Sequence, residues 1–448
     1  MADEYMSEGH LRNGRVILPY GRSVMALVAA HSLGQKGVEV IGCDSVDFTI
    51  LSFSSHVKEH FVYPDFLKDE QAFIDFMVDK VKALKPDDGQ PYVLMPVYKD
   101  SEVLARHKER FAPYIQVATP DVEAMERLHP KDNFARTMQE LNISSPQTWL
   151  PEDEGALKAL DLPFPVLIKP YNQTGGRGIH KAENMEALVQ YWRDNKKKYA
   201  QKSLVQEMVE GKDYCLSALY DDGVCKASMA YRNVHRFPPT DSGSGILRET
   251  VPDKRFESIA SDLMEPLGWN GVAEFDFLWD EKENSVPALI EVNTRFWGGL
   301  FQSVESGIDF PWLLYKLTVN GEVEEAGEAQ EGVRTKMPYV WLVSAVKDAV
   351  GKDEDFKEIE ERGRQALRQM KDGELFEGLK AYSAYLADYL GETFNVGKKA
   401  RRLNKALETG RTAHNELLNS DDPYAAFGVL FILGSLIRHG ELPQEVRF

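Results

Sequence analysis

The sequence predicts a mixed α/β and α+β protein with a doubly wound N-terminal domain, a strand-rich middle region and a mainly helical C-terminal region. Three observations support this prediction. Strand and helix patterns alternate over residues 15–96, short strand-like runs bounded by glycine or polar turns dominate residues 166–293, and helical spacing takes over after residue 333. At 448 residues, of which 43% are hydrophobic and 28% charged, the chain can form several globular domains.

The N-terminal region opens with a βαβ pattern. Apolar periodicity predicts strands and helices at residues 15–20, 22–35, 38–42, 72–84 and 92–96. Because parallel strands need crossover helices, this order favours a small doubly wound sheet. Asp44 follows the second strand, where some sheets hold a ribose, but no Gly-x-Gly-x-x-Gly motif precedes it. Tyr20, Gly21 and Arg22 lie at the carboxyl end of the first strand, where ligands gather in such sheets.

Two strand-like runs within residues 271–300 carry the most informative acidic residues. Side chains alternate between the faces of a strand, so Glu274 and Asp276 share one face, and Glu291 and Asn293 share a face as well. The polar turn at residues 280–284 predicts that the two runs pair antiparallel. Carboxylates that lie so close need a cation, and magnesium prefers hard oxygen ligands. The alternative is a solvated hairpin face.

Residues 166–181 supply a candidate phosphate-binding loop. Lys169 lies at the end of an apolar run, and the loop that follows contains Gly175, Gly176, Arg177 and Gly178. Glycines let backbone N–H groups approach an anion, and a lysine that ends an apolar run loses solvation unless an anion meets it. The loop has neither the P-loop pattern nor the dinucleotide-binding spacing, and taken alone it could be a flexible surface turn.

The order of these features resembles the ATP-grasp superfamily of ADP-forming carboxylate–amine ligases. The ordered set consists of Lys131 before a helix, Lys169 with its glycine loop, the strand that ends at Gln206 and Glu207, then Glu274, and finally Glu291, Asn293 and Arg295. The resemblance covers about residues 15–320. It implies a Rossmann-like pre-ATP-grasp domain over residues 1–125, an ATP-grasp domain over residues 126–330 with lobes at 126–205 and 206–330, and a helical domain over residues 331–448.

The resemblance also implies roles for individual residues, with ATP and Mg²⁺ as cofactors and Mn²⁺ as a substitute. Lys169 and Arg295 would be catalytic, with Arg295 facing the transferred phosphoryl group and the acid. The metal ligands would be Glu274, Glu291 and Asn293, with Asp276 left as a supporting residue. The nucleotide would contact Lys131, Lys169, Thr174, Gly175, Gly176, Arg177, Gly178, Gln206, Glu207, Met208, Val209 and Asp213.

Several of these residues also have simpler explanations. Lys131 could be an exposed lysine in a first helical turn, Asp213 could be an ordinary turn residue, and Arg295 could pair with a carboxylate. A further substrate candidate is the segment that contains Arg232, His235 and Arg236, because guanidinium groups bind carboxylates through paired hydrogen bonds. The alternative for that segment is a solvated loop held by salt bridges.

Composition limits the classes of partner. The net charge of −18 and the pI near 5.1 disfavour nucleic acid and anionic membranes, so an anion site must be a local basic patch. Three cysteines without Cys-x-x-Cys spacing and a polar start without a signal pattern predict a cytoplasmic protein. The longest apolar stretch, residues 424–437, is too short to span a membrane and predicts a buried helix. The aromatic and charged helices after residue 333 are compatible with a homodimer surface.

The predicted function is ATP-dependent ligation of a small carboxylate, such as an amino acid, to an amine. The acid would become an acyl phosphate, and attack by the amine would release phosphate. A carboxylase-type enzyme that activates bicarbonate is a second interpretation, although no biotin-acceptor segment is evident. A non-catalytic nucleotide-binding scaffold is a third.

Overall fold

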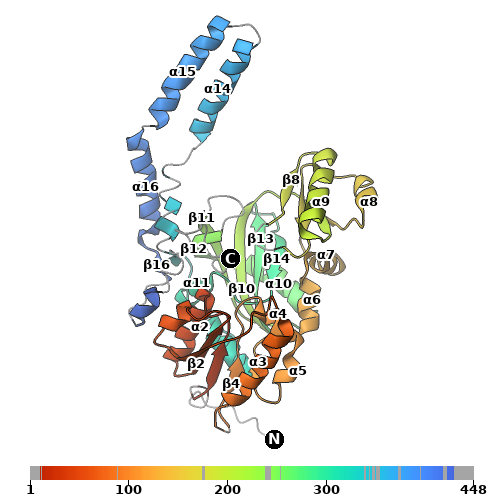
Figure 1. Ribbon diagram of the computed structural model, residues 1–448, viewed down its shortest axis with the longest axis vertical. Helices are drawn as coiled ribbons and strands as arrows, with labels where there is room; N and C mark the ends of the chain where they lie inside the picture. Colours follow the sequence, from red (N-terminus) through yellow and green to blue (C-terminus); the bar gives the residue numbers. More distant parts are fainter. Residues whose placement is uncertain are drawn as a thin grey trace. The chain divides into compact units, whose positions relative to one another are not determined.

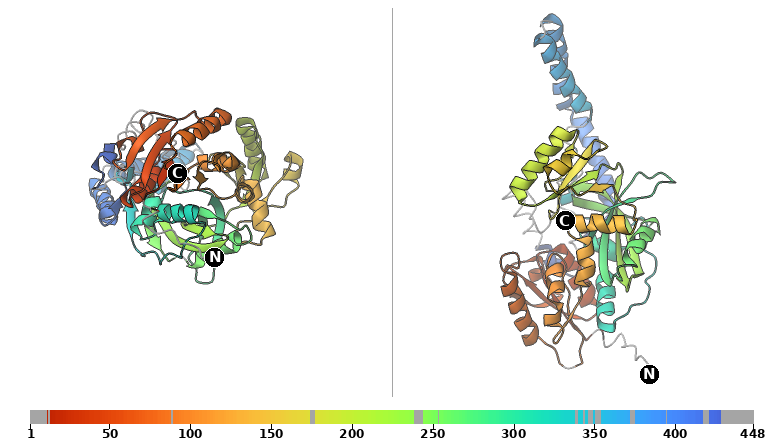
Figure 2. Two further views of the ribbon diagram at one scale, coloured as in Figure 1. Left: turned by 90° about the horizontal axis from the view of Figure 1, so that it is seen from below. Right: turned by 90° about the vertical axis from the view of Figure 1, so that its right-hand side faces the viewer.

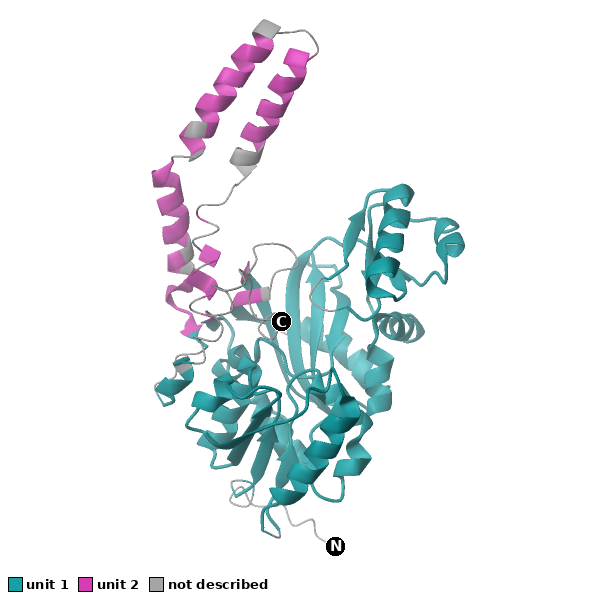
Figure 3. Ribbon diagram, viewed as in Figure 1, with its two compact units in different colours: residues 1–234, 248–335, 415–448 teal, residues 235–247, 336–414 magenta. Residues whose placement is uncertain are grey.

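The computed structural model describes residues 11, 13–87, 89–173, 177–237, 244–252, 254–337, 340–342, 344–345, 349, 354–371, 375–393, 395–416 and 421–427. The chain divides into two compact units (Figure 3). Unit 1 comprises residues 1–234, 248–335 and 415–448, and unit 2 comprises residues 235–247 and 336–414.

The first sheet of unit 1 is parallel and five-stranded, in the order β3-β2-β1-β4-β5. Figure 1 labels two of its strands, β2 and β4. Its strands are β1 (Arg15–Leu18), β2 (Glu39–Asp44), β3 (Val57–Val62), β4 (Tyr92–Leu94) and β5 (Gln116–Val117). The connecting helices are α2 (Val24–Gln35), η1 (Ile50–Phe53), α3 (Glu70–Ala83), α4 (Asp100–Arg106) and α5 (Lys108–Phe111). Ser23 and Asp69 cap α2 and α3 by accepting backbone N–H groups, which satisfies donors that have no partner within the helix. The predicted doubly wound sheet is confirmed.

The second sheet of unit 1 is four-stranded, in the order β6-β9-β7-β8. Its strands are β6 (Thr148–Trp149), β7 (Val166–Pro170), β8 (His180–Ala182) and β9 (Ser203–Glu207). In the sequence, α6 (Val122–Leu128) and α7 (Lys131–Glu140) precede β6, α8 (Glu154–Lys158) precedes β7, and α9 (Met185–Tyr199) precedes β9. Helix α9 lies on one face of this sheet (Figure 2). Its buried side chains share a hydrophobic cluster with Val166 and Ile168 of β7. Because strand side chains alternate, Lys169 lies on the other face.

The third sheet is seven-stranded, in the order β14-β13-β10-β11-β12-β15-β16. Its strands are β10 (Lys212–Asp221), β11 (Val224–Phe237), β12 (Ser244–Val251), β13 (Gly271–Trp279), β14 (Ala288–Asn293), β15 (Arg334–Lys336) and β16 (His414–Asn415). Helix α10 (Lys254–Met264) packs through Phe256 and Leu263 against Phe275 and Phe277 of β13. The other face of β13 is therefore left to Glu274 and Asp276. Helices α11 (Leu300–Glu305) and α12 (Phe310–Asn320) follow β14.

The C-terminal region contains α14 (Glu354–Lys371), α15 (Leu375–Thr393), α16 (Val396–Arg411) and η2 (Pro423–Phe427), which confirms its helical character. It also contributes β15 and β16 to the third sheet, which the sequence did not predict. The buried helix expected at residues 424–437 is wrong in its described part: η2 is a 3-10 helix in which Tyr424 and Phe427 are exposed, and the remainder lies outside the described residues. Among the described residues, no helix has the length and apolarity needed to cross a membrane.

Candidate active site

The paired strands β13 and β14 bring the predicted metal ligands onto one face. Glu274 lies opposite Asn293, and Asp276 lies opposite Glu291. The amide Nδ2 of Asn293 donates to Glu274 at 3.3 Å and to Asp276 at 3.4 Å. Four oxygen-bearing side chains therefore converge, and the donor set fits a hard divalent cation.

The two carboxylates of β13 differ in their surroundings. Glu274 is 7% exposed and accepts a hydrogen bond from the Tyr231 hydroxyl, whereas Asp276 is partly exposed and accepts one from the Cys215 thiol at 3.3 Å. Burial raises the pKa of Glu274. Burial, with the negative charges of Glu274 and Glu291, raises the pKa of Asp276 well above its usual value. A cation among these groups would relieve their repulsion.

Two lysines from the second-sheet region surround Glu291 with positive charge. Lys131, the first residue of α7, donates to Gln173 O at 2.8 Å and lies 3.3 Å from Glu291 Oε1. Burial alone would raise the pKa of Glu291, but Lys131 and Lys169 together hold it below its ordinary value. Glu291 is therefore ionised and available as a ligand at neutral pH.

Lys169 is held by a short polar chain. Its Nζ donates to Gln206 Oε1 at 2.6 Å, and Gln206 Nε2 donates to Thr148 Oγ1 at 3.0 Å. Burial lowers the pKa of Lys169 to about 8, against the raising effect of Glu291. Gln206 itself is buried, and its side-chain oxygen accepts the hydrogen bond that positions the lysine.

The glycine loop is described only in part. Thr174, Gly175 and Gly176 lie outside the described residues. Gly178 has a φ of +72°, and a Cβ there would lie 2.6 Å from the Tyr199 ring, so glycine is required on both counts. Arg177 is exposed in this loop.

The predicted adenine segment leaves the second sheet at Glu207. Glu207 pairs with Gln147 through its backbone N–H at 2.8 Å, Met208 is 37% exposed, and Val209 is partly exposed. Asp213 lies in β10, on the same face as Cys215, and its negative charge contributes to the raised pKa of Asp276. The boundary predicted between residues 205 and 206 falls inside β9, because this strand ends at Glu207.

Arg295 contacts both the metal-site face and the first sheet. Its guanidinium donates to Asn293 Oδ1 at 3.1 Å and to Phe296 O at 2.7 Å. It also lies 4.6 Å from the ring centroid of Tyr98, which follows β4. Sequence reasoning missed Tyr98 and Lys99, although the rule that ligands gather at strand carboxyl ends applies to β4 as well as to β1.

The predicted substrate segment lies in β11. Arg232 forms an ion pair with Glu249 of β12 at 2.6 Å, and Arg334 forms one with the same Glu249 at 2.7 Å. The Arg232 guanidinium therefore already has a carboxylate partner within the protein. His235 and Arg236 belong to unit 2, and residues 238–243 lie outside the described residues. Asp44, the ribose candidate, instead forms an ion pair with Arg22.

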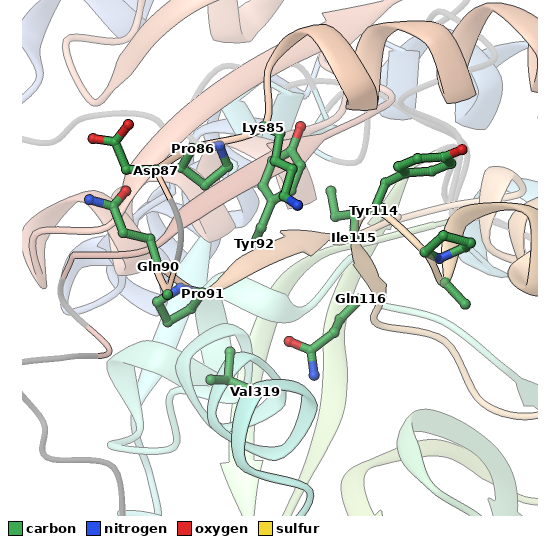
Figure 4. Close-up of a pocket in the computed structure, with 13 residues that line it drawn as sticks. Lys85, Pro86, Asp87, Gln90, Pro91, Tyr92, Tyr114, Ile115, Gln116 and Val319 are labelled. Carbon is green, nitrogen blue, oxygen red and sulfur yellow. The ribbon is translucent and has the colours of Figure 1, made fainter.

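A cavity of about 360 Å³ lies elsewhere in the first sheet region (Figure 4). Its lining includes Tyr92 and Gln116, the first residues of β4 and β5, together with Lys85 and Val319. It is therefore at the amino ends of these strands, whereas Tyr98 follows the carboxyl end of β4. None of the predicted site residues lines it.

Comparisons with known proteins agree with this geometry. A family model described as "ATP-grasp in the biosynthetic pathway with Ter operon" matches residues 200–338. The carbamoyl phosphate synthase large chain, C-terminal section, of Methanopyrus kandleri is 25% identical over 191 residues, which cover 40% of this chain and 35% of that protein. These matches support assignment of the chain to the ATP-grasp superfamily. It spans about a third of the length of this curated relative, so that protein's overall activity does not transfer to it directly.

Solved structures with lower identity share this ATP-grasp fold. Biotin carboxylase from Campylobacter jejuni, in a β-γ-ATP complex, has a TM-score of 0.57 and 18% identity, covering 72% of this chain and 75% of its own. The L-amino acid ligase from Bacillus licheniformis has a TM-score of 0.53 and 16% identity, covering 69% of this chain and 74% of its own. The predicted fold class is thereby confirmed.

Proposed function

We propose that this ATP-grasp protein is an ADP-forming ligase that activates a small carboxylate as an acyl phosphate and transfers the acyl group to an amine. The observation that carries the proposal is the convergence of Lys131 on Glu291 beside Asn293 and Arg295. Phosphoryl transfer depends on positioning and charge neutralisation, and this set offers both cations and metal ligands.

In this proposal each of the chain's own site residues has a binding or an orienting role. Lys131 and Lys169 bind the phosphates of ATP, and Arg295 orients the transferred phosphoryl group and the attacking carboxylate. Glu274, Glu291 and Asn293 would hold Mg²⁺, or Mn²⁺ in its place, and the cation would supply neutralisation of phosphate charge. The remaining nucleotide contacts are those expected from the sequence, between residues 174 and 213. Partners are small-molecule acids and amines.

Asp276 joins the proposed metal ligands Glu274, Glu291 and Asn293. It lies directly opposite Glu291 and is more exposed than Glu274, whose carboxylate is tied to Tyr231. A ligand must give up other bonds to reach a metal, so Asp276 is better placed to do so. This favours Asp276 over the supporting role expected from the sequence.

The test measures ADP and phosphate after the protein is incubated with MgATP, pools of carboxylic acids and hydroxylamine, which traps an acyl phosphate as a hydroxamate. Glu291→Gln should reduce kcat roughly 100 to 1000-fold, because the loss of one charge-stabilising group costs about 3 to 4 kcal/mol. Glu283→Gln, in the exposed turn between β13 and β14, is the matched control and should keep full activity.

Three results would contradict the proposal. Nucleotide binding without turnover in any pool favours the scaffold interpretation. Release of AMP and pyrophosphate indicates another ligase chemistry. Turnover with bicarbonate alone, and with no organic acid, favours the carboxylase interpretation.

A further inference from the structure

Two histidines and an aspartate converge in unit 1, outside the candidate active site. His31 lies in α2, His56 lies between η1 and β3, and Asp422 directly precedes η2. One ring nitrogen of each histidine and one carboxylate oxygen of Asp422 lie within 4.8 Å of one another. Tertiary packing therefore joins His31 to an aspartate that is 391 positions away in the sequence.

Asp422 is fully buried and is held in place by several hydrogen bonds. His31 Nε2 lies 2.7 Å from Asp422 Oδ2, and the Ser54 hydroxyl donates to the same oxygen at 2.5 Å. Ser55 donates to Oδ1 through its backbone N–H at 3.0 Å and through its hydroxyl at 3.2 Å. Donors of this number favour the ionised carboxylate. The two serines also fix its orientation, as the partners of metal-binding carboxylates do.

The ring of His56 packs against α2 beside His31. A Cβ on Gly34 would lie 2.6 Å from His56 Nδ1, so the ring needs a glycine at this position of the helix. Gly34 follows His31 by three residues and therefore shares its side of α2. The centroids of the two histidine rings are 5.1 Å apart.

His56 also carries a buried polar atom that the protein does not satisfy. Its Nε2 has no hydrogen-bond partner within the part of the chain that the structure describes. A polar atom that is buried without a partner costs free energy. A bond from this nitrogen to a cation would remove that cost.

The donor set at this cluster differs from that of the candidate active site. Two imidazole nitrogens and one carboxylate oxygen suit a divalent transition cation such as Zn²⁺, whereas magnesium prefers oxygen ligands alone. Donor atoms around a tetrahedral Zn²⁺ lie about 3.3 Å apart, so the side chains would rotate inward to close on the ion. The His31 side chain is 15% exposed and offers an entry route.

We propose that His31, His56 and Asp422 bind one divalent transition cation, with the remaining coordination position left to water. The proton on His31 Nε2 is displaced, to Nδ1 or to solvent, and Nε2 then binds the ion. Because both histidines lie in the N-terminal domain, the ion fastens the segment of residues 421–427 to that domain. Phe427 of this segment already contacts Phe53 of η1, with ring centroids 6.4 Å apart. The inference does not depend on the proposed ligase function.

Titration of the metal-free, full-length protein with Zn²⁺ tests the proposal. Excess Mg²⁺ is present so that it competes for the oxygen-rich candidate active site. Wild-type protein should bind one equivalent of Zn²⁺, and His56→Gln and Asp422→Asn should each weaken this binding at least about tenfold, because each removes one ligand. His60→Gln is the matched control: it alters an exposed histidine of β3 outside the cluster and should bind as the wild type does.

Hydrogen exchange supplies a second readout. Zn²⁺ should slow the exchange of amides in residues 421–427 of the wild type, and it should have no such effect in His56→Gln. Because the wild-type measurement needs no variant, it decides the proposal even if a substitution prevents folding.

Three results would overturn the proposal. The first is the absence of stoichiometric Zn²⁺ binding by the wild type, or of any effect on exchange in residues 421–427. The second is unchanged affinity in both cluster variants. The third is binding that persists in those variants but is lost in Asp276→Asn, which would assign the ion to the group formed by Cys215, Glu274 and Asp276.

Discussion

At the scale of single residues, the metal site can be tested by comparing substitutions of the two acidic side chains of β13, Asp276 and Glu274. Asp276→Asn should raise the Mg²⁺ concentration needed for half-maximal turnover at least about tenfold, which corresponds to about 1.4 kcal/mol. Glu274→Gln should raise it less, because Glu274 is buried and bound to Tyr231. Metal-dependence curves of phosphate release measure both effects. A larger effect for Glu274→Gln would restore the assignment made from the sequence.

Lys169 gives the site a predictable dependence on pH. Burial lowers its pKa to about 8, and the protonated form is the one that attracts phosphate. MgADP affinity should therefore be constant below about pH 8 and should weaken by up to about tenfold per pH unit as pH rises through that value. Titration calorimetry from about pH 7 to about pH 9 measures this dependence. In Lys169→Met the inflection should disappear, and its persistence would assign it to another group.

Single residues were predictable from the sequence where strand alternation decides their direction. Glu274, Asp276, Glu291 and Asn293 share one face as expected. The arrangement of Tyr98 over Arg295 was not predictable, because it joins residues almost two hundred positions apart that meet only through tertiary packing. The engagement of Gln206 by Lys169 was missed for the same reason.

At the scale of elements, long periodic segments were predicted and short ones were not. Strand β13 and helix α3 carry enough alternating or helical positions to define a pattern, whereas β15 spans 3 residues and β16 spans 2. Such short strands form because a sheet edge offers unpaired backbone groups, and the local sequence does not encode that partner. The helical spacing of α14 and α15 was visible, but their mutual packing was not.

The close contact between α14 and α15 can be tested through glycine. A Cβ on Gly378 would lie 2.9 Å from the backbone nitrogen of Met370 and 3.1 Å from the carbonyl oxygen of Ala366, so the helix backbones would have to separate. Gly378→Ala should therefore lower the stability of this pair by about 1 to 3 kcal/mol. Gly391 has open space around it, and Gly391→Ala should raise helix stability by about 0.5 to 1 kcal/mol.

Hydrogen exchange of the α14 and α15 amides measures both glycine effects locally. Opposite signs for the two variants are expected. Equal stabilisation by both would mean that the helices pack less closely at Gly378 than the structure indicates.

At the scale of the whole molecule, the net charge of −18 opposes the binding of an anionic nucleotide. This effect is offset locally by three cationic side chains beside the buried carboxylates: Lys131, Lys169 and Arg295. These carboxylates still repel a triphosphate unless a cation lies between them. Nucleotide affinity should therefore be linked to magnesium, although the lysines alone already attract phosphate.

This linkage should appear in the stability of the protein. A ligand that binds only the native state at about 100 times its Kd adds about 2.7 kcal/mol to the free energy of unfolding. MgADP at that level should raise the thermal midpoint of wild-type protein, and the same ADP concentration with EDTA should raise it much less. Glu291→Gln should show a reduced difference between the two conditions, because one carboxylate of the cation site is gone. Equal shifts with and without EDTA would mean that the nucleotide binds without the cation, and that the carboxylates of β13 and β14 serve another purpose.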